Sequence, residues 1–79
     1  MANELRASLL MLRGKRARLE CVHGFQVEGL LEDVNGTYLK MVDVTFICQG
    51  MSVDLPGIDV NFQTVMGCTP AKRVGAGKF

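Results

Sequence analysis

The sequence predicts a mainly β protein in which a short N-terminal α-helix precedes a five-stranded, strongly bent antiparallel open β-barrel. Three observations lead to this fold class. Apolar residues recur with a helical period over residues 3–13, the period changes to two from Lys15, and closely spaced turn signals divide the remaining chain into five runs. So many short strands in 79 residues suit a barrel that does not close, which leaves two strand edges unpaired.

The helix is predicted over residues 3–13, N-E-L-R-A-S-L-L-M-L-R. Leu5, Leu9 and Leu12 share one stripe of this helix, and the arginines lie toward its other side. A helix of about three turns does not persist alone in water, so it has to cover an apolar surface. We expect that surface to be the core of the same domain rather than a membrane.

Two strands with a period of two follow the helix. The first begins at Lys15, and a tight turn at His23-Gly24 connects it to the second, which covers residues 25–33. Gly29 lies in the middle of the second strand. Because glycine has no side chain to pack, it indicates a sharp bend or the close approach of another backbone at this point.

The next hairpin is indicated by Asn35-Gly36, since both residues tolerate the positive φ of a tight reversal. The run 37–48 that follows is long for one strand, and its apolar residues change face along it. A bulge near Val42-Asp43 reconciles its two halves.

The last two strands are predicted at residues 51–55 and 58–65. Pro56-Gly57 is the turn signal between them, because these two residue types favour a tight reversal and proline cannot donate to a sheet. Gly67 is expected to end the regular structure.

The predicted division is one domain over residues 1–66 and a flexible basic tail over residues 67–79. Charge is also distributed unevenly along the chain. Residues 1–18 carry a net +4, residues 19–71 a net −6 and residues 72–79 a net +3. An acidic body repels a polyanion, so nucleic-acid contact is expected from the basic ends or from one local site. Basic ends that only keep the chain in solution are the alternative.

The residue inventory argues against an enzyme, a metal centre or a cofactor. Cys21, Cys48 and Cys68 form no C-x-x-C pair, and His23 completes no zinc site with them at a familiar spacing. An odd cysteine count indicates a reduced, intracellular compartment. No apolar run approaches the roughly 20 residues that span a bilayer, so no membrane partner is expected.

Two short motifs resemble those of the Sm and Sm-like family. The run G-F-Q-V-E-G-L-L at 24–31 resembles the first Sm motif, with two glycines five positions apart in an alternating apolar strand. The run L-P-G at 55–57, followed by Val60 and Phe62, resembles the second motif, whose usual form is Ile-Arg-Gly before an apolar strand. The resemblance covers roughly residues 4–66 and implies the Sm-like fold.

The resemblance also implies partners. Sm-like proteins form closed rings of several subunits by joining the fourth strand of one subunit to the fifth strand of its neighbour. We therefore expect other Sm-fold subunits, either copies of this chain or paralogues, in the nucleus or cytoplasm if the source is eukaryotic. The candidate subunit-interface residues are Met51, Val53, Leu55, Val60 and Phe62.

In RNA-binding members of the family, an Asp and an Asn after the second strand and the Arg of the second motif hold a base. Here Asn35 stands at the Asp, Tyr38 falls near the Asn, and Pro56 replaces the Arg. An amide lacks the carboxylate charge and proline lacks the guanidinium, whereas Tyr38 could still stack on a base. The candidate RNA-binding residues are Asn35, Tyr38, Gly57, Arg16 and Arg18.

These observations predict a non-catalytic Sm-like subunit that assembles by strand edge pairing. The expected setting is a ring or heteromer of a ribonucleoprotein or of its assembly machinery, and the resemblance includes divergent members of the Gemin type, which lack the usual RNA-binding residues. An Sm-like ring that contacts single-stranded RNA directly is the alternative. A barrel that binds single strands as a monomer is a further one.

Overall fold

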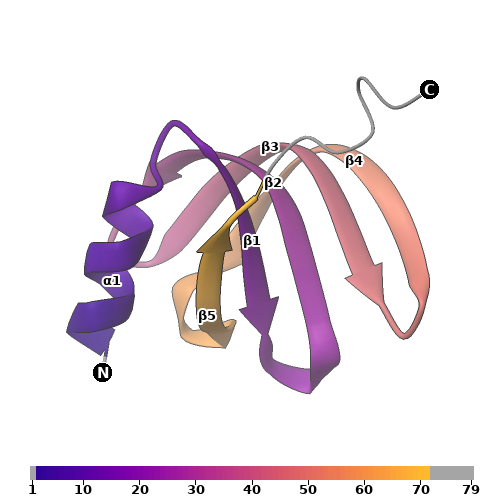
Figure 1. The fold of residues 1–79 in the computed structure, drawn as a ribbon, viewed down its shortest axis with the longest axis horizontal. Helices are drawn as coiled ribbons and strands as arrows, with labels where there is room; N and C mark the ends of the chain where they lie inside the picture. The colour runs from indigo at the N-terminus through magenta and orange to yellow at the C-terminus, as the bar shows by residue number, and fades with distance from the viewer. Residues whose placement is uncertain (1, 72–79) are drawn as a thin grey trace.

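Residues 2–71 form a curled five-stranded sheet with one α-helix at its end (Figure 1). The computed structural model describes residues 2–71. Short 3₁₀ turns η1 and η2 connect β1 to β2 and β4 to β5, and every strand pairing is antiparallel in the order β4-β3-β2-β1-β5. The predicted fold class is confirmed. The elements are α1 (Ala2–Met11), β1 (Arg16–Cys21), η1 (Val22–Gly24), β2 (Phe25–Val34), β3 (Tyr38–Cys48), β4 (Met51–Asn61), η2 (Phe62–Thr64) and β5 (Val65–Pro70).

Helix α1 closes one end of the curled sheet. Its Leu9 side chain is fully buried, and Leu5 and Leu12 pack against the same core, so the predicted stripe covers the chain's own domain. The chain leaves the helix through Gly14, whose φ of 83° favours glycine. The Gly14 N–H then donates to the Leu31 carbonyl at 2.7 Å, which ties the end of the helix segment to β2.

The sharp bend predicted at Gly29 is present. A Cβ atom at this position would lie 2.9 Å from the Val42 carbonyl oxygen and 3.0 Å from the Asp43 carbonyl oxygen. On the neighbouring strand Asp43 has a φ of 54°, and the pairing of β3 with β4 passes from Val42 to Val44 without it. The predicted bulge in β3 therefore lies where β2 is most closely approached, and the two features bend the sheet together.

The predicted turn at Pro56-Gly57 is wrong. Strand β4 runs without interruption from Met51 to Asn61, and Gly57 pairs with Val42 in the middle of it. Pro56 is absent from the pairing register at the position where Asp43 is also skipped. Since β4 is an edge strand with an irregularity at this point, a residue without an N–H group is accommodated there.

The fifth strand lies further along the chain than predicted. It covers Val65–Pro70, so Gly67 is inside it and the predicted boundary between residues 66 and 67 divides it. Gly67 pairs with Glu20 of β1, and pairing reaches beyond the strand because the Ala71 N–H donates to the Arg16 carbonyl at 3.0 Å. The rest of the predicted tail, residues 72–79, lies outside the described residues.

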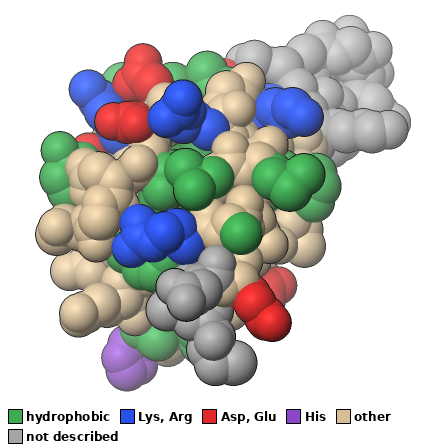
Figure 2. All heavy atoms as spheres, turned by 90° about the vertical axis from the view of Figure 1, so that its left-hand side faces the viewer, with side chains coloured by type: hydrophobic (Ala, Val, Ile, Leu, Met, Phe, Trp, Pro, Cys, Tyr) green, Lys and Arg blue, Asp and Glu red, His purple; other side chains and the backbone are tan. Residues whose placement is uncertain are grey.

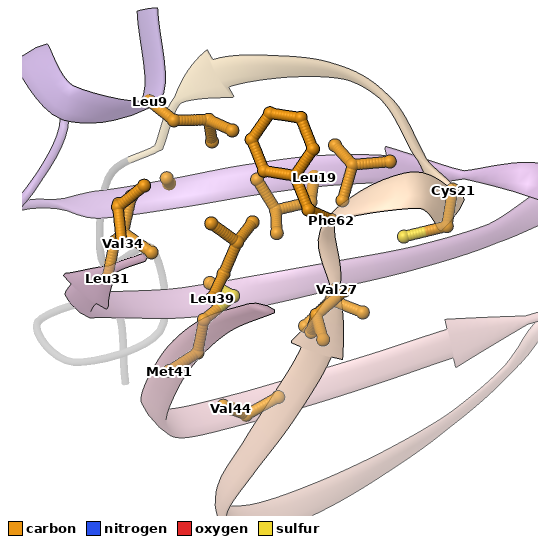
Figure 3. Close-up of a cluster of buried hydrophobic side chains, with 13 residues drawn as sticks. Leu9, Leu19, Cys21, Val27, Leu31, Val34, Leu39, Met41, Val44 and Phe62 are labelled. Carbon is orange, nitrogen blue, oxygen red and sulfur yellow. The ribbon is translucent and has the colours of Figure 1, made fainter. Parts of the chain in front are cut away.

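The core lies between the helix and the inner face of the sheet. Side chains from α1, from all five strands and from η2 point toward one another there (Figure 3). Their burial supplies most of the stabilisation that a chain of this size obtains. The buried residues are Leu9, Ala17, Leu19, Cys21, Val27, Leu31, Val34, Leu39, Met41, Val44, Val60, Phe62 and Val65.

Candidate functional site

The sheet has two outer strands, and each offers an unpaired side. Within residues 2–71, β4 pairs only with β3 and β5 pairs only with β1. The outward N–H and C=O groups of an edge strand are ready to pair with another chain. The open barrel predicted from the sequence is therefore present, and its two unpaired edges are β4 and β5.

One row of neighbours across the sheet shows how burial is lost toward β4. Leu19, Val27, Phe46 and Val53 are paired in succession from β1 to β4 and share the inner face. Leu19 is fully buried and Val27 is 2% exposed, whereas Phe46 is half-buried and Val53 is 50% exposed. The inner face thus continues into the β3–β4 hairpin, where no other segment within residues 2–71 covers it.

Two exposed methionines lie on the edge strands. Met51 at the start of β4 and Met66 in β5 are each 71% exposed. On β2 and β3, the rings of Phe25 and Phe46 contact each other with centroids 5.5 Å apart and remain only partly buried. Exposed apolar side chains along unpaired strands are typical of a protein interface.

The predicted interface residues do not divide between the two edges as expected. Met51, Val53 and Leu55 lie on β4 as predicted, and Val60 lies on the same strand. Phe62 belongs to η2 and is buried at 9% exposure, so it contributes to the core. The fifth strand was predicted as an edge but was placed at 58–65, so Met66 was missed, although the apolar pair Val65-Met66 is a signal that could have located β5.

A second cluster forms where the turn after β2 meets the turn after β4. The Asn35 side chain accepts hydrogen bonds from the N–H groups of Thr37 at 2.7 Å and Tyr38 at 2.9 Å. The predicted turn at Asn35-Gly36 is therefore present. Neither residue has the positive φ that the prediction was based on, and the Asn35 side chain holds the turn instead. The Phe62 N–H donates to the Thr37 carbonyl at 2.9 Å and joins the two turns.

Arg6 of α1 reaches into this turn cluster. Its guanidinium lies 4.5 Å from the centroid of the Phe62 ring, and one Nη donates to the Asn35 carbonyl at 3.3 Å. Around it is a hollow of about 380 Å³ with a mixed polar and apolar lining. On the face that carries α1, basic and acidic side chains lie around exposed apolar ones (Figure 2). The hollow is lined by Arg6, Gly36, Thr37, Asn61, Phe62 and Gln63.

The structure brings together only part of the predicted RNA-binding set. Asn35 and Tyr38 are adjacent, and Tyr38, at 40% exposure, pairs with Asn61 at the edge of the turn cluster. Gly57 lies four residues before Asn61 on β4, which is about 13 Å from it at the usual rise of a strand. Arg6 and Asn61 were missed, because their part in this cluster depends on contacts between distant segments.

The two arginines of β1 lie elsewhere, on the outer face of the sheet. The Arg16 guanidinium is 3.1 Å from the Asp43 carboxylate on β3, and that of Arg18 is 3.7 Å from Glu28 on β2. These pairs cross the outer face at a distance from the turn cluster, and each cation has an acidic neighbour. These carboxylates compete with a phosphate for both guanidinium groups, and RNA contact by Arg16 and Arg18 stays a prediction.

We next consider the cysteine thiols and the metal-ligating side chains of the described part of the chain. Burial raises the pKa of the Cys21 thiol, and a hydrogen bond with Thr64 opposes this effect. Burial also raises the pKa of the Cys68 thiol. Among residues 2–71 no group of three or more metal-ligating side chains occurs, and no described helix is long and apolar enough to cross a membrane.

Solved structures match the fold, although no protein-family model and no curated protein matches the sequence. The P. aerophilum SmAP1 heptamer superposes at a TM-score of 0.73 and 20% identity, over 86% of this chain and 93% of that one. The Pyrococcus abyssii Sm protein in complex with a uridine heptamer gives 0.72 and 18%, over 82% and 94%. A chain of the NatC complex bound to CoA gives 0.69 and 17%, over 81% and 84%. The chain therefore has the Sm fold.

Proposed function

We propose that this chain is a non-catalytic subunit of the Sm-like family that assembles through the edges of β4 and β5. The assembly is a ring or a heteromer within a ribonucleoprotein or its assembly machinery. The observation that carries this proposal is the loss of burial along the inner face toward β4, from fully buried Leu19 to half-exposed Val53.

Edge pairing accounts both for the unpaired main-chain groups of β4 and for its exposed apolar side chains. A strand added beside β4 would satisfy its outward main-chain groups and would cover Met51 and Val53. A chain of this size is marginally stable alone, so burial against a partner also adds to its stability. The likeness to the P. aerophilum SmAP1 heptamer supports a ring, and the likeness to a chain of the NatC complex supports a heteromer.

Three methionines of similar exposure allow a matched test. Met51 and Met66 lie on the two edge strands at 71% exposure, and Met11 lies on α1 at 77%. Burying a methionine side chain in an interface is worth about 1.5–3 kcal/mol. Met51→Lys and Met66→Lys are therefore each expected to weaken assembly roughly tenfold or more, whereas Met11→Lys leaves it unchanged.

Native mass spectrometry and sedimentation velocity, on the chain alone and with candidate Sm-fold partners, measure this difference. Circular dichroism confirms that each variant is folded before it is compared. Equal behaviour of the three variants would contradict the assignment of β4 and β5 as the interface. A chain that remains monomeric with every Sm-fold partner would contradict the proposal as a whole.

Direct RNA contact is the second candidate, and the turn cluster favours it. Arg6 supplies a guanidinium beside the hollow, and Tyr38 exposes a ring that could stack on a base. The likeness to the Pyrococcus abyssii Sm protein in complex with a uridine heptamer gives the probe. Such contact would be local, since the body of the chain is acidic.

Anisotropy of a labelled uridine heptamer tests this candidate. Tyr38→Ala is expected to lower affinity by about 1–3 kcal/mol if a base stacks on the ring. Arg6→Ala should also lower it, whereas Arg13→Ala, two residues after the end of α1 and with a side chain 57% exposed, is the matched control. If all three variants bind like the wild type, the turn cluster is not an RNA site.

A further inference from the structure

The turn between β2 and β3 contains an Asn-Gly pair. The asparagines of the sequence are Asn3, Asn35 and Asn61, and glycine follows only Asn35. In such a pair the main-chain nitrogen of the second residue can attack the side-chain amide of the first, because glycine has no Cβ to obstruct the approach. Whether this reaction occurs in the folded chain depends on which atoms of the turn are open and which are held.

The attacking nitrogen and the leaving nitrogen are both open. Within residues 2–71 the Gly36 N–H donates no hydrogen bond, and neither does the side-chain nitrogen of Asn35. Gly36 is exposed, and a Cβ at its position would meet nothing within 4 Å. Water and hydroxide therefore have access to the Gly36 N–H, and the amide nitrogen of Asn35 is free to leave.

The oxygen of the same amide is held by two donors. The N–H groups of Thr37 and Tyr38 donate to the Asn35 Oδ1 at 2.7 and 2.9 Å. Attack on the Asn35 Cγ converts this oxygen into an oxyanion, and main-chain N–H groups at such distances stabilise a developing oxyanion. The turn is therefore arranged like a small acyl-transfer site in which Gly36 supplies the nucleophile.

We propose that Asn35 is a self-modification site, at which the folded chain converts this asparagine to aspartate and isoaspartate. Hydroxide removes the Gly36 amide proton, and the nitrogen forms a bond to the Asn35 Cγ. The Cγ–Nδ2 bond then breaks, and ammonia leaves with a proton from water, which restores the hydroxide. Water opens the resulting cyclic imide at one of its two carbonyl groups, so that aspartate or isoaspartate is left.

The isoaspartyl product alters the turn cluster. Its main chain runs through Cγ, so the turn gains a backbone atom and loses the side-chain bonds to the Thr37 and Tyr38 N–H groups. The original carbonyl of residue 35, which accepts from Arg6 at 3.3 Å, becomes a free carboxylate. The conversion therefore releases the turn that carries Tyr38 and places a negative charge beside the Arg6 guanidinium. Neither effect depends on edge pairing or on RNA.

Peptide mapping by mass spectrometry of the full-length chain, incubated at neutral and mildly alkaline pH, tests the proposal. Asn35 should convert at least about tenfold faster than Asn61, the internal control, because a side chain follows Asn61 although its Oδ1 also accepts a main-chain N–H, that of Gln63 at 2.8 Å. The rate should rise with pH and should be no lower than in the chain unfolded in guanidinium chloride, since the two donors act only in the folded turn. Gly36→Ala, whose Cβ meets nothing, should keep the fold and slow the conversion roughly tenfold.

Slower conversion of Asn35 in the folded chain than in the unfolded chain would overturn the proposal, because the turn would then protect the asparagine. Conversion of Gly36→Ala at the wild-type rate would overturn it as well. Hydrogen exchange gives a second readout, since the Thr37 and Tyr38 N–H groups should exchange at least about tenfold faster in the isoaspartyl fraction, which ion-exchange chromatography separates. Unchanged exchange would overturn the proposed release of the turn.

Discussion

The two ends of the curled sheet differ in what covers them. At the helix end, Leu9, Leu31 and Leu39 are fully buried under α1, whereas at the β3–β4 hairpin Met51 and Val53 are largely open to solvent. The same strands, β2 and β3, form the inner face at both ends. The helix end of this apolar surface is buried within the fold, and the hairpin end supplies the exposed side chains on which the proposed assembly rests.

Truncating the helix end should give the largest effect on folding. Leu9→Ala removes a fully buried side chain and leaves a cavity, so the free energy of unfolding should fall by about 2–5 kcal/mol. Leu10→Ala, next to it and 48% exposed, is the matched control and should cost far less. Urea denaturation measures both. Equal losses would mean that α1 does not pack as described.

A smaller loss is expected at the bend that joins the two ends. Gly29→Ala places a Cβ within 3.1 Å of three backbone atoms of β3, which have little freedom to move. The expected cost is about 1–3 kcal/mol of unfolding free energy. At Gly36 a Cβ would meet nothing within 4 Å, so Gly36→Ala is the control. If Gly29→Ala is as stable as Gly36→Ala in the same urea titration, the close approach is absent.

Alkaline pH should lower the stability of the folded chain through two thiols on β1 and β5. The pKa values of Cys21 and Cys68 are raised in the folded state by burial, so the folded chain holds these protons more tightly than the unfolded one. Their contribution to the free energy of unfolding is complete below the ordinary thiol pKa, and it is lost as the pH rises past about 9. Urea titrations at neutral and alkaline pH check this. A Cys21→Val/Cys68→Ala variant should lose less stability, and an identical loss would refute the assignment to these thiols.

The smallest effect on folding is expected at the open end. Val53→Ser changes a half-exposed side chain, so the unfolding free energy of the dilute chain should change by no more than about 0.5 kcal/mol. Val27→Ser, in the same cross-strand row but buried, should cost several times more. Assembly should show the reverse dependence: Val53→Ser, which hardly affects folding, should weaken the association of subunits. Equal effects of the two variants on stability would remove the proposed contrast between the ends.

Features that depend on local chemistry were predictable from the sequence. The helix follows from its leucine spacing, and the bend at Gly29 follows from a glycine inside an alternating strand. The phase change of the apolar residues in run 37–48 similarly located the bulge at Asp43. Each signal lies within a few residues of the feature that it predicts.

The errors arose where the position of a strand within the sheet decides the outcome. Pro56 and Gly67 end interior strands, but on edge strands both are tolerated because one side of the ladder is free. The turn cluster was missed for a related reason. Arg6 meets Asn35 and Phe62 only because the sheet curls, and no local pattern reports that contact.

Cys21 makes the seam between β1 and β5 chemically visible. It pairs with Val65, the first residue of β5, and it is buried on the inner face at 8% exposure. Opening of that seam exposes the thiol fully, so the rate at which a thiol-specific reagent modifies Cys21 should rise when β5 detaches. Comparing this rate in dilute and concentrated samples would show whether neighbouring copies hold the seam shut.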